Sequence, residues 1–257
     1  MNSLSLPEGP AWFASDLHLG PATPATSEAF LALLQAAAGQ AAALLLPGDI
    51  FDAWIGDDAA RAAPPWLAAV LGGLQQVSAR IPVWLGRGNR DFLMGRELAE
   101  RVGARLLPEQ VLLQTPCGRI LLSHGDEFCT DDTAYQQFRA MVRDPRWQEQ
   151  FLSKPIPERL QLAAQARGES MSANQAKSME IMDVNPDAVA AALRTTDVDL
   201  LIHGHTHRPA RHVLELDGRR RERWVLPDWD CDHVSPPRGG WLVVDRDGPQ
   251  VYDLESA

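Results

Sequence analysis

Residues 31–49 have the sequence "LALLQAAAGQAAALLLPGD". Its apolar length approaches that of a membrane span, but Gln35, Gly39 and Gln40 interrupt it, and it ends in Pro-Gly-Asp without flanking basic residues. An alanine-rich helix followed by a short buried strand explains the stretch better than a membrane span does. The residue that follows this strand, Asp49, introduces a pattern that recurs along the chain.

At five places a short apolar run is followed at once by small residues and then by Asp, Asn or His. Apolar runs bounded by glycine predict buried strands, and helical stretches over residues 26–43 and 66–79 separate the first of them. Strand-helix alternation predicts parallel pairing, and polar groups at the ends of parallel strands collect in one cleft. The five runs are "AWFASDLHLG" (11–20), "ALLLPGDIFD" (43–52), "VWLGRGNRD" (83–91), "ILLSHGDE" (120–127) and "LLIHGHTH" (200–207).

The pattern changes in the second half of the chain. We interpret residues 131–186 as a helical cap inserted into a single domain of residues 1–257, because no comparable strand run occurs there. Beyond the cap, two segments with Asp-Gly turns, 212–226 and 240–254, predict hairpins. The helical segments of the cap, separated by prolines, are 134–143, 146–154 and 158–182.

Composition limits the classes of function. Apolar residues make up 45% of the chain and charged residues 23%, as in ordinary globular proteins. A formal net charge of -10 disfavours nucleic acid as a partner. Cys117, Cys129 and Cys231 lie far apart without CxxC spacing, which fits a reducing compartment. We expect a cytoplasmic protein, because the first residues lack the basic and apolar segments of a secretory signal. We also expect a monomer.

The polar residues at the strand ends are the predicted metal ligands. Carboxylate and amide oxygens with imidazole nitrogens suit manganese, iron or zinc, and this number of ligands exceeds the need of one ion. We therefore predict two ions about 3.5 to 4 Å apart that share one carboxylate, for which we choose Asp49. Asn89 would add a neutral oxygen ligand beside a phosphate. The predicted ligands are Asp16, His18, Asp49, Asn89, His124, His205 and His207.

Each cluster by itself also has an ordinary explanation. A lone "DLH" or "GDIFD" after a strand is more often a helix cap or a solvated turn. Two histidines at i and i+2 beside glycine, as in "GHTH", are rarely core residues and carry a stronger signal. All the clusters together, each at a strand end, favour the metal interpretation.

The complete set resembles the calcineurin-like metallophosphoesterases, whose pattern is D-x-H, G-D-x-x-D, G-N-H-D or a variant, a later H, and G-H-x-H. The resemblance implies an α/β fold in which two packed mixed β-sheets are flanked by helices (αββα). It implies two divalent ions, usually Mn²⁺, one held by Asp16, His18, Asp49 and His207, the other by Asp49, Asn89, His124 and His205.

Arg90 departs from that pattern, because most of the family has histidine there. With "AWIGDD", "GNRDFLMG", "HGDEFCTDD", "KSMEIMDVN" and "IHGHTHRP", it makes the chain similar to the branch that hydrolyses UDP-2,3-diacylglucosamine in lipid A biosynthesis. There, metal-activated water attacks the alpha phosphorus and releases UMP and 2,3-diacylglucosamine 1-phosphate. The resemblance implies catalytic roles for Asn89, Arg90, Asp91 and His124, and substrate contacts for Asn89, Arg90, Asp132, Ser170, Asn174, Lys177 and His205.

The cap has its own chemical character. Residues 133–180 hold seven Lys or Arg and five Asp or Glu, a net charge of +2 against -12 for the rest of the chain. Apolar side chains such as Phe138, Met141, Trp147 and Leu160 lie between these charges. Such a cap would shelter acyl chains and bring the protein to the cytoplasmic face of the inner membrane as a peripheral protein. Ordinary packing of the cap helices is the alternative.

Two alternative functions stay open, and two further stretches have a competing interpretation. The metals would also serve a soluble nucleotide phosphodiester, and an inactive phosphoesterase fold would serve as a binding scaffold. The basic stretch "GRRRER", residues 218–223, is interpreted as a solvated hairpin tip rather than a lipid-phosphate site. The acidic stretch "DWDCDH", residues 228–233, is interpreted as a hydrated turn rather than a third metal site.

Overall fold

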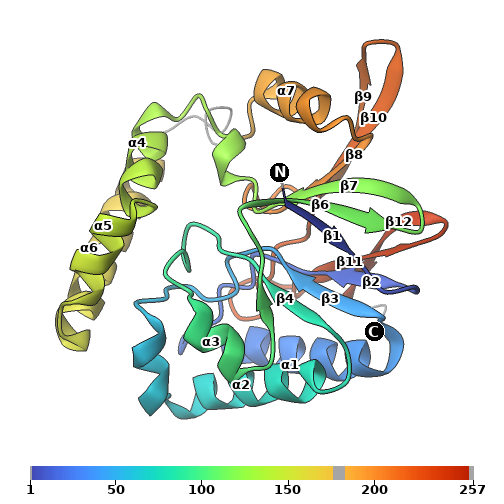
Figure 1. Ribbon diagram of the computed structural model, residues 1–257. Helices are drawn as coiled ribbons and strands as arrows, with labels where there is room; N and C mark the ends of the chain where they lie inside the picture. Colours follow the sequence, from blue (N-terminus) through green and yellow to red (C-terminus); the bar gives the residue numbers. More distant parts are fainter. Residues whose placement is uncertain (1, 176–182, 255–257) are drawn as a thin grey trace.

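The computed structural model describes residues 2–175 and 183–254, and of residues 169–175 only the helical backbone. Two β-sheets pack face to face, with helices on both outer faces (Figure 1). The first sheet has the order β12-β11-β2-β3-β4-β5 and the second has the order β1-β6-β7-β8-β10-β9. The strands are β1 Asn2–Ser5, β2 Ala11–Phe13, β3 Ala43–Leu46, β4 Val83–Leu85, β5 Arg105–Leu106, β6 Gln110–Thr115, β7 Gly118–Ser123, β8 Leu200–His203, β9 Ala210–Leu216, β10 Arg219–Val225, β11 Gly240–Asp245 and β12 Gly248–Asp253.

The predicted strand-helix alternation is confirmed in the first sheet. Strands β2, β3, β4 and β5 pair in parallel, and helices α1 (Pro24–Gln40) and α2 (Pro65–Ser78) make the crossovers between β2, β3 and β4. Stretch 31–49 is therefore the end of α1 and the whole of β3, as predicted, although the helix ends three residues earlier than expected. Among the described residues, no helix has both the length and the apolar character of a membrane span.

Both faces of the first sheet are buried, which explains why its strands are apolar without interruption. Leu44 and Leu46 of β3 pack with α1 and α2, whereas Ala43 and Leu45 face the second sheet. All four side chains are completely buried. Burying a leucine side chain contributes about 1.5 to 3 kcal/mol, so these short strands hold the two layers together.

A helix that the sequence analysis did not predict covers the second sheet. Helix α7 (Pro186–Thr196) packs its buried Val189 and Leu193 against Leu121 and Leu201 of that sheet. Asn185 caps it by accepting hydrogen bonds from the backbone N–H groups of residues 187 and 188. The αββα layering is thus complete. The remaining short helices are α3 Arg96–Arg101, η1 Asp57–Ala62 and η2 Asp126–Phe128.

The cap helices lie to one side of the sheets (Figure 1). They are α4 (Thr133–Val142), α5 (Pro145–Leu152) and α6 (Ile156–Gln175), so the three helical segments are confirmed over the described residues. The last part of predicted segment 158–182, residues 176–182, lies outside the described range. Arg159 anchors α6: its guanidinium is 2% exposed and donates hydrogen bonds to the Ile55 carbonyl and the Asp58 carboxylate.

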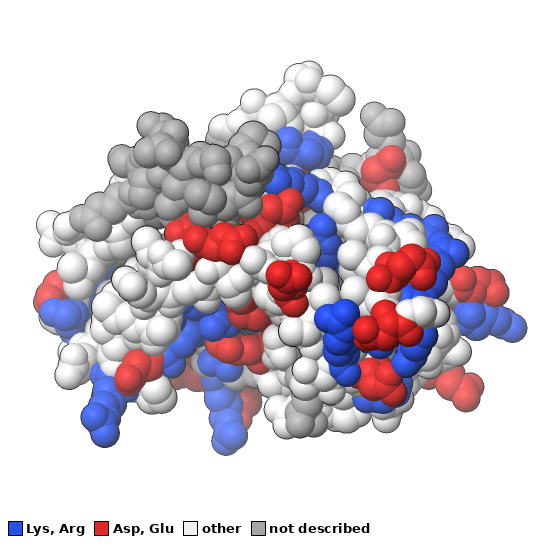
Figure 2. All heavy atoms as spheres, turned by 90° about the horizontal axis from the view of Figure 1, so that it is seen from above, with Lys and Arg blue, Asp and Glu red and all other residues white. Residues whose placement is uncertain are grey.

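The prediction of a solvated tip for "GRRRER" is wrong in part. Arg219 and Arg220 are exposed, but the alternation of β10 turns Arg221 and Arg223 inward, where they are 3% and 9% exposed. Arg221 donates hydrogen bonds to the Leu193 and Val198 carbonyls. Arg219 pairs with Asp197 and Asp199. Basic and acidic side chains lie next to each other over part of the face that Figure 2 shows.

Candidate active site

The predicted ligands come together because the ends of five strands meet. Asp16, Asp49 and Asn89 follow β2, β3 and β4 of the first sheet. His124 follows β7 of the second sheet, and the pair His205 and His207 follows β8. Distances of 2.9 to 3.7 Å link ligand atoms of one sheet to those of the other. The interface between the two sheets therefore opens onto one polar centre.

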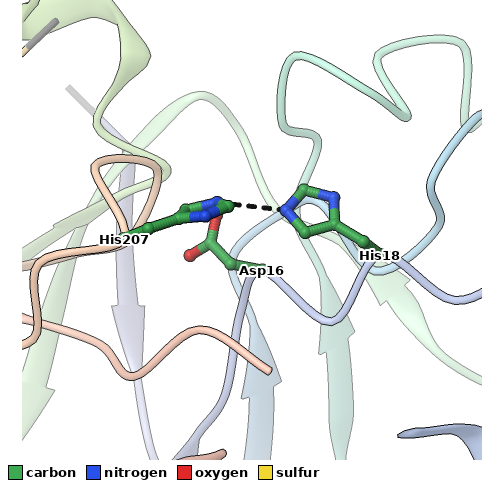
Figure 3. A group of neighbouring side chains, drawn as sticks. All are labelled: Asp16, His18 and His207. Carbon is green, nitrogen blue, oxygen red and sulfur yellow. Dashed lines mark hydrogen bonds and ion pairs between the residues drawn. The ribbon is translucent and has the colours of Figure 1, made fainter. Parts of the chain in front are cut away.

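The first group consists of Asp16, His18 and His207 (Figure 3). The Nε2 atoms of His18 and His207 face each other at 3.1 Å. His207 Nε2 also lies 3.6 Å from Asp16 Oδ1. Two imidazole nitrogens and a carboxylate oxygen that converge in this way form a set of ligands suited to one metal ion.

The second group consists of Asp16, Asp49 and His124, all three buried. The Asn89 side-chain oxygen adds to it, because it lies 3.2 Å from His124 Nε2 and 2.9 Å from His205 Nδ1. The neutral amide oxygen thus faces two imidazoles, as expected for a ligand that adds no charge.

Two carboxylates connect the groups. Asp49 points one oxygen at each group: Oδ2 lies 3.9 Å from His18 Nδ1, and Oδ1 lies 3.7 Å from His124 Nε2. Asp16 belongs to both groups. The choice of Asp49 as the shared ligand agrees with the placement of its two oxygens and stays a prediction.

The backbone is strained at these ligands. Within the described part of the chain, seven residues other than glycine have a positive φ between 46° and 69°, a conformation that costs about 1 to 3 kcal/mol each where it is sparsely populated. Two of them, Asp197 and Asp217, occupy a helix end and a hairpin turn. The other five, whose strain the packed sheets offset, are predicted ligands: Asp16, His18, Asp49, His205 and His207.

Two glycines let the loops approach closely. A Cβ atom on Gly88 would overlap the Asp49 carboxylate, and one on Gly204 would overlap the Asp16 carboxylate. The backbone N–H of His205, next to Gly204, donates to both Asp16 oxygens at 3.0 Å. Glycine at these two positions therefore brings ligands from different strands into contact.

Asp91 lies behind the centre rather than in it. Its fully buried carboxylate accepts hydrogen bonds at 2.7 to 3.3 Å from the backbone N–H groups of Asp49, Ile50, Phe51 and Gly88. It thereby joins the loop after β3 to the loop after β4. These contacts give Asp91 a positioning role, and the catalytic role that the family resemblance implies stays a prediction.

Burial and charge tune the protonation of the ligands. Burial lowers the pKa of His18 to about 3 and that of His205 to about 4, so both imidazoles are neutral near pH 7. Burial raises the pKa of Asp49 to about 7, against the attraction of His124. Burial also acts to raise the pKa of Asp16, but the hydrogen bond to His207 and the nearby histidines outweigh it and lower that pKa.

The centre fits divalent metal. Two buried carboxylates lie beside each other, and the sets of oxygen and nitrogen atoms converge without thiolates. His18 Nδ1 and His124 Nδ1 are buried and have no hydrogen-bond partner among the described residues. Buried carboxylates need a compensating positive charge, and a metal supplies it.

A cavity of about 920 Å³ lies over the ligands. Asn89, Arg90, Asp132 and His205, predicted to contact substrate, all line it. The Asp132 carboxylate also caps α4 by accepting from the Tyr135 N–H at 3.0 Å. Three further predicted contacts are untested: Ser170 and Asn174 lie on α6 where side chains are outside the described structure, and Lys177 lies outside the described residues.

The contact between Asp126 and the cap helix α4 was not predicted from the sequence. This buried carboxylate accepts hydrogen bonds from the Tyr135 hydroxyl at 2.7 Å and from Arg139 Nε at 2.8 Å, both on α4. The Tyr135 ring stacks on His205, with ring centroids 5.8 Å apart. The stretch "HGDE" marks the strand end that carries His124, but nothing in it shows that the Asp126 carboxylate reaches the cap helix.

Comparisons with known proteins identify the family of this chain. Residues 9–209 match the family model described as calcineurin-like phosphoesterase. A protein of Bordetella pertussis named UDP-2,3-diacylglucosamine hydrolase is 77% identical over 99% of this chain and 98% of its own length. A protein of the same name from Chromobacterium violaceum is 46% identical over 94% of this chain and 98% of its own. Among solved structures, a Vps29 variant from Entamoeba histolytica covers 95% of this chain and 91% of its own with 16% identity and a TM-score of 0.45. The chain belongs to the calcineurin-like phosphoesterase family.

Proposed function

We propose that the protein hydrolyses the pyrophosphate bond of UDP-2,3-diacylglucosamine at the alpha phosphorus and releases UMP and 2,3-diacylglucosamine 1-phosphate, a step of lipid A biosynthesis. The relatives that match nearly the whole chain carry the name of this hydrolase. The observation that carries the proposal is the cavity itself, whose base is a set of metal ligands and whose wall is apolar.

Two Mn²⁺ ions would occupy the centre. Asp16, His18, Asp49 and His207 would hold one, and Asp49 would share the other with Asn89, His124 and His205. When bound, such ions supply an acidified water and neutralise charge on the phosphate oxygens.

Arg90 lines the cavity beside the ligands, and its backbone N–H donates to Asp49 Oδ1 at 2.8 Å. Its planar guanidinium suits two phosphate oxygens, so we assign it to binding the phosphate rather than to protonating the leaving group. Asn89 holds its oxygen between His124 and His205 through the hydrogen-bond distances given above. In this arrangement the chain positions the pyrophosphate, and water attacks the phosphorus next to uridine.

The apolar wall would take the two acyl chains. Each methylene removed from water contributes about 0.8 kcal/mol, so a few methylenes of each chain outweigh the cost of ordering them. Side chains from the cap and from the first sheet's loops supply this wall: Trp54, Ile55, Phe92, Leu93, Phe138, Met141, Trp147, Phe151 and Leu162.

The cap would also bring the protein to its substrate at the cytoplasmic face of the inner membrane, as a peripheral protein. Six of the eight large apolar side chains that are exposed in the described part of the chain lie on the cap helices, Met141 and Leu160 among them at 47% and 55%, and this concentration favours a lipid contact. In this proposal the chain is a monomeric single domain of residues 1–257, with residues 131–186 as the cap.

The test is hydrolysis by purified, metal-free protein supplied with Mn²⁺ and UDP-2,3-diacylglucosamine in detergent. UDP-glucose, a cyclic nucleotide and a CDP-alcohol serve as competing substrates, and Asp49→Asn protein controls for contaminating hydrolases. We expect UMP release that requires metal and prefers the diacylated substrate. Preference for a soluble nucleotide would favour the phosphodiesterase alternative, and no hydrolysis of any substrate would favour the scaffold.

A further inference from the structure

The two nitrogens of the His207 ring face different partners. Nε2 faces the ligand group, 3.1 Å from His18 Nε2 and 3.6 Å from Asp16 Oδ1. Nδ1 faces the other way, 3.5 Å from Asp228 Oδ2. A neutral imidazole binds a metal through one nitrogen only when the other nitrogen carries the proton. The partner of Nδ1 therefore decides whether Nε2 is available.

Asp228 is buried and held in place. The residue is 2% exposed, and its carboxylate oxygen Oδ2 accepts hydrogen bonds from the Arg238 guanidinium at 2.7 and 3.1 Å. Oδ1 is buried and accepts no hydrogen bond within the described part of the chain. The next residue, Trp229, donates its backbone N–H to the Asp16 carbonyl at 3.0 Å. The segment is thereby fixed to the same strand end that carries Asp16.

The chain turns back so that Arg238 can reach Asp228. Asp230 and Arg238 exchange two backbone hydrogen bonds, at 2.8 and 2.9 Å, which closes the intervening residues into a loop. The Arg238 side chain is 50% exposed, so the guanidinium covers the solvent side of the carboxylate and offsets its charge. The same oxygen, Oδ2, lies 3.5 Å from His207 Nδ1, so one carboxylate oxygen faces both the guanidinium and the imidazole.

We propose that Asp228 is a positioning residue that accepts the Nδ1–H of His207 and so presents Nε2 to a divalent metal. The inference rests on the proposed metal centre. Asp228 lies beyond residue 209, where the match to the family model ends, so it is assigned by the geometry of this chain alone. Partners of ligating histidines affect metal affinity or activity about 10- to 100-fold when they are removed.

The competing explanation is that Asp228 and Arg238 only close a loop. Four variants separate the two roles: Asp228→Ala, Asp228→Asn, Arg238→Gln and, as a matched control in the same loop, Asp230→Asn. Asp230 accepts hydrogen bonds from His233 and residue 232 and does not contact His207 in the structure. Two measurements apply: calorimetric titration with Mn²⁺, and nitrogen NMR of labelled histidines in metal-free protein at alkaline pH, where imidazoles are neutral.

We expect Asp228→Ala to weaken one of two Mn²⁺ sites by about 10- to 100-fold, to leave the other near its original affinity, and to shift the His207 signal away from the Nδ1–H form. Asp228→Asn, which keeps an oxygen acceptor, should fall between Asp228→Ala and the unmodified protein. Asp230→Asn should change neither measurement. Arg238→Gln should lower the melting temperature while keeping the His207 tautomer.

Unchanged Mn²⁺ affinity together with an unchanged His207 tautomer in Asp228→Ala would overturn the inference. Equal loss of stability in Asp228→Ala and Arg238→Gln without a change in the His207 signal would do the same, because it would show a loop-closing ion pair. The tautomer is measured without metal or substrate. A failure of UMP release with a normal response of His207 would therefore count against the proposed function and leave the role of Asp228 standing.

Discussion

Replacing Asp91 with alanine should destabilise the protein strongly although Asp91 is not a predicted metal ligand. Its carboxylate is the acceptor for four backbone N–H groups, those of Asp49, Ile50, Phe51 and Gly88. A buried donor left without an acceptor costs about 1 to 3 kcal/mol, which gives about 4 to 12 kcal/mol for four. Because water can enter the space of the missing carboxylate, we expect about 4 kcal/mol, the lower end of that range.

The assay is urea unfolding followed by tryptophan fluorescence, from which the free energy of unfolding is extrapolated. Asp91→Asn should fall between the alanine variant and the unmodified protein, because its amide keeps one oxygen acceptor. Glu97→Ala is the control: this carboxylate pairs with Arg61 at the surface, and exposed ion pairs contribute about 0 to 1 kcal/mol. A loss below about 1 kcal/mol in Asp91→Ala would refute the claim that this carboxylate holds the two loops together.

Three further predictions concern the ligands and the thiols. Asn89→Ala should lower kcat by about 100-fold or more with little change in melting temperature, because its oxygen faces His124 and His205; near-normal turnover would show that Asn89 is not a ligand. Burial raises the pKa of Asp49 to about 7, so a proton competes with the metal as the pH falls through that value, and calorimetry should show Mn²⁺ affinity falling by about tenfold in total from about pH 8 to about pH 6. Constant affinity over that range would contradict a protonated Asp49. Burial raises the pKa of Cys129 to about 12, so maleimide should modify exposed Cys117 in the native protein long before Cys129, and rapid labelling of Cys129 by mass spectrometry would contradict its burial.

The sheet layers and the meeting of the polar residues at the strand ends were predictable because their signals are local. A buried strand of a two-sided sheet is apolar throughout, and a ligand directly after it needs only a glycine and a polar residue. The stretch 31–49 contains both signals, and the structure confirms the helix and the strand that were expected there. The same reasoning applies to the loops that carry Asn89 and His205.

Other features depend on contacts between distant parts of the chain and escaped prediction. Arg221 looks like a surface residue in a basic run, but it is buried because two carbonyls of another segment accept its hydrogen bonds. Asp126 belongs to a recognisable stretch, yet its partners Tyr135 and Arg139 lie on a helix whose placement no local pattern gives. Asp228 is similar, because only the fold brings it to His207.

The proposed centre directs water to the alpha phosphorus of a lipid-linked nucleotide. The position of attack can be measured by hydrolysing UDP-2,3-diacylglucosamine with the Mn²⁺-loaded protein in heavy-oxygen water and analysing both products by mass spectrometry. We expect the heavy oxygen in UMP and not in the sugar phosphate. Label in 2,3-diacylglucosamine 1-phosphate would show attack at the other phosphorus and would contradict the proposed function, as would the absence of UMP.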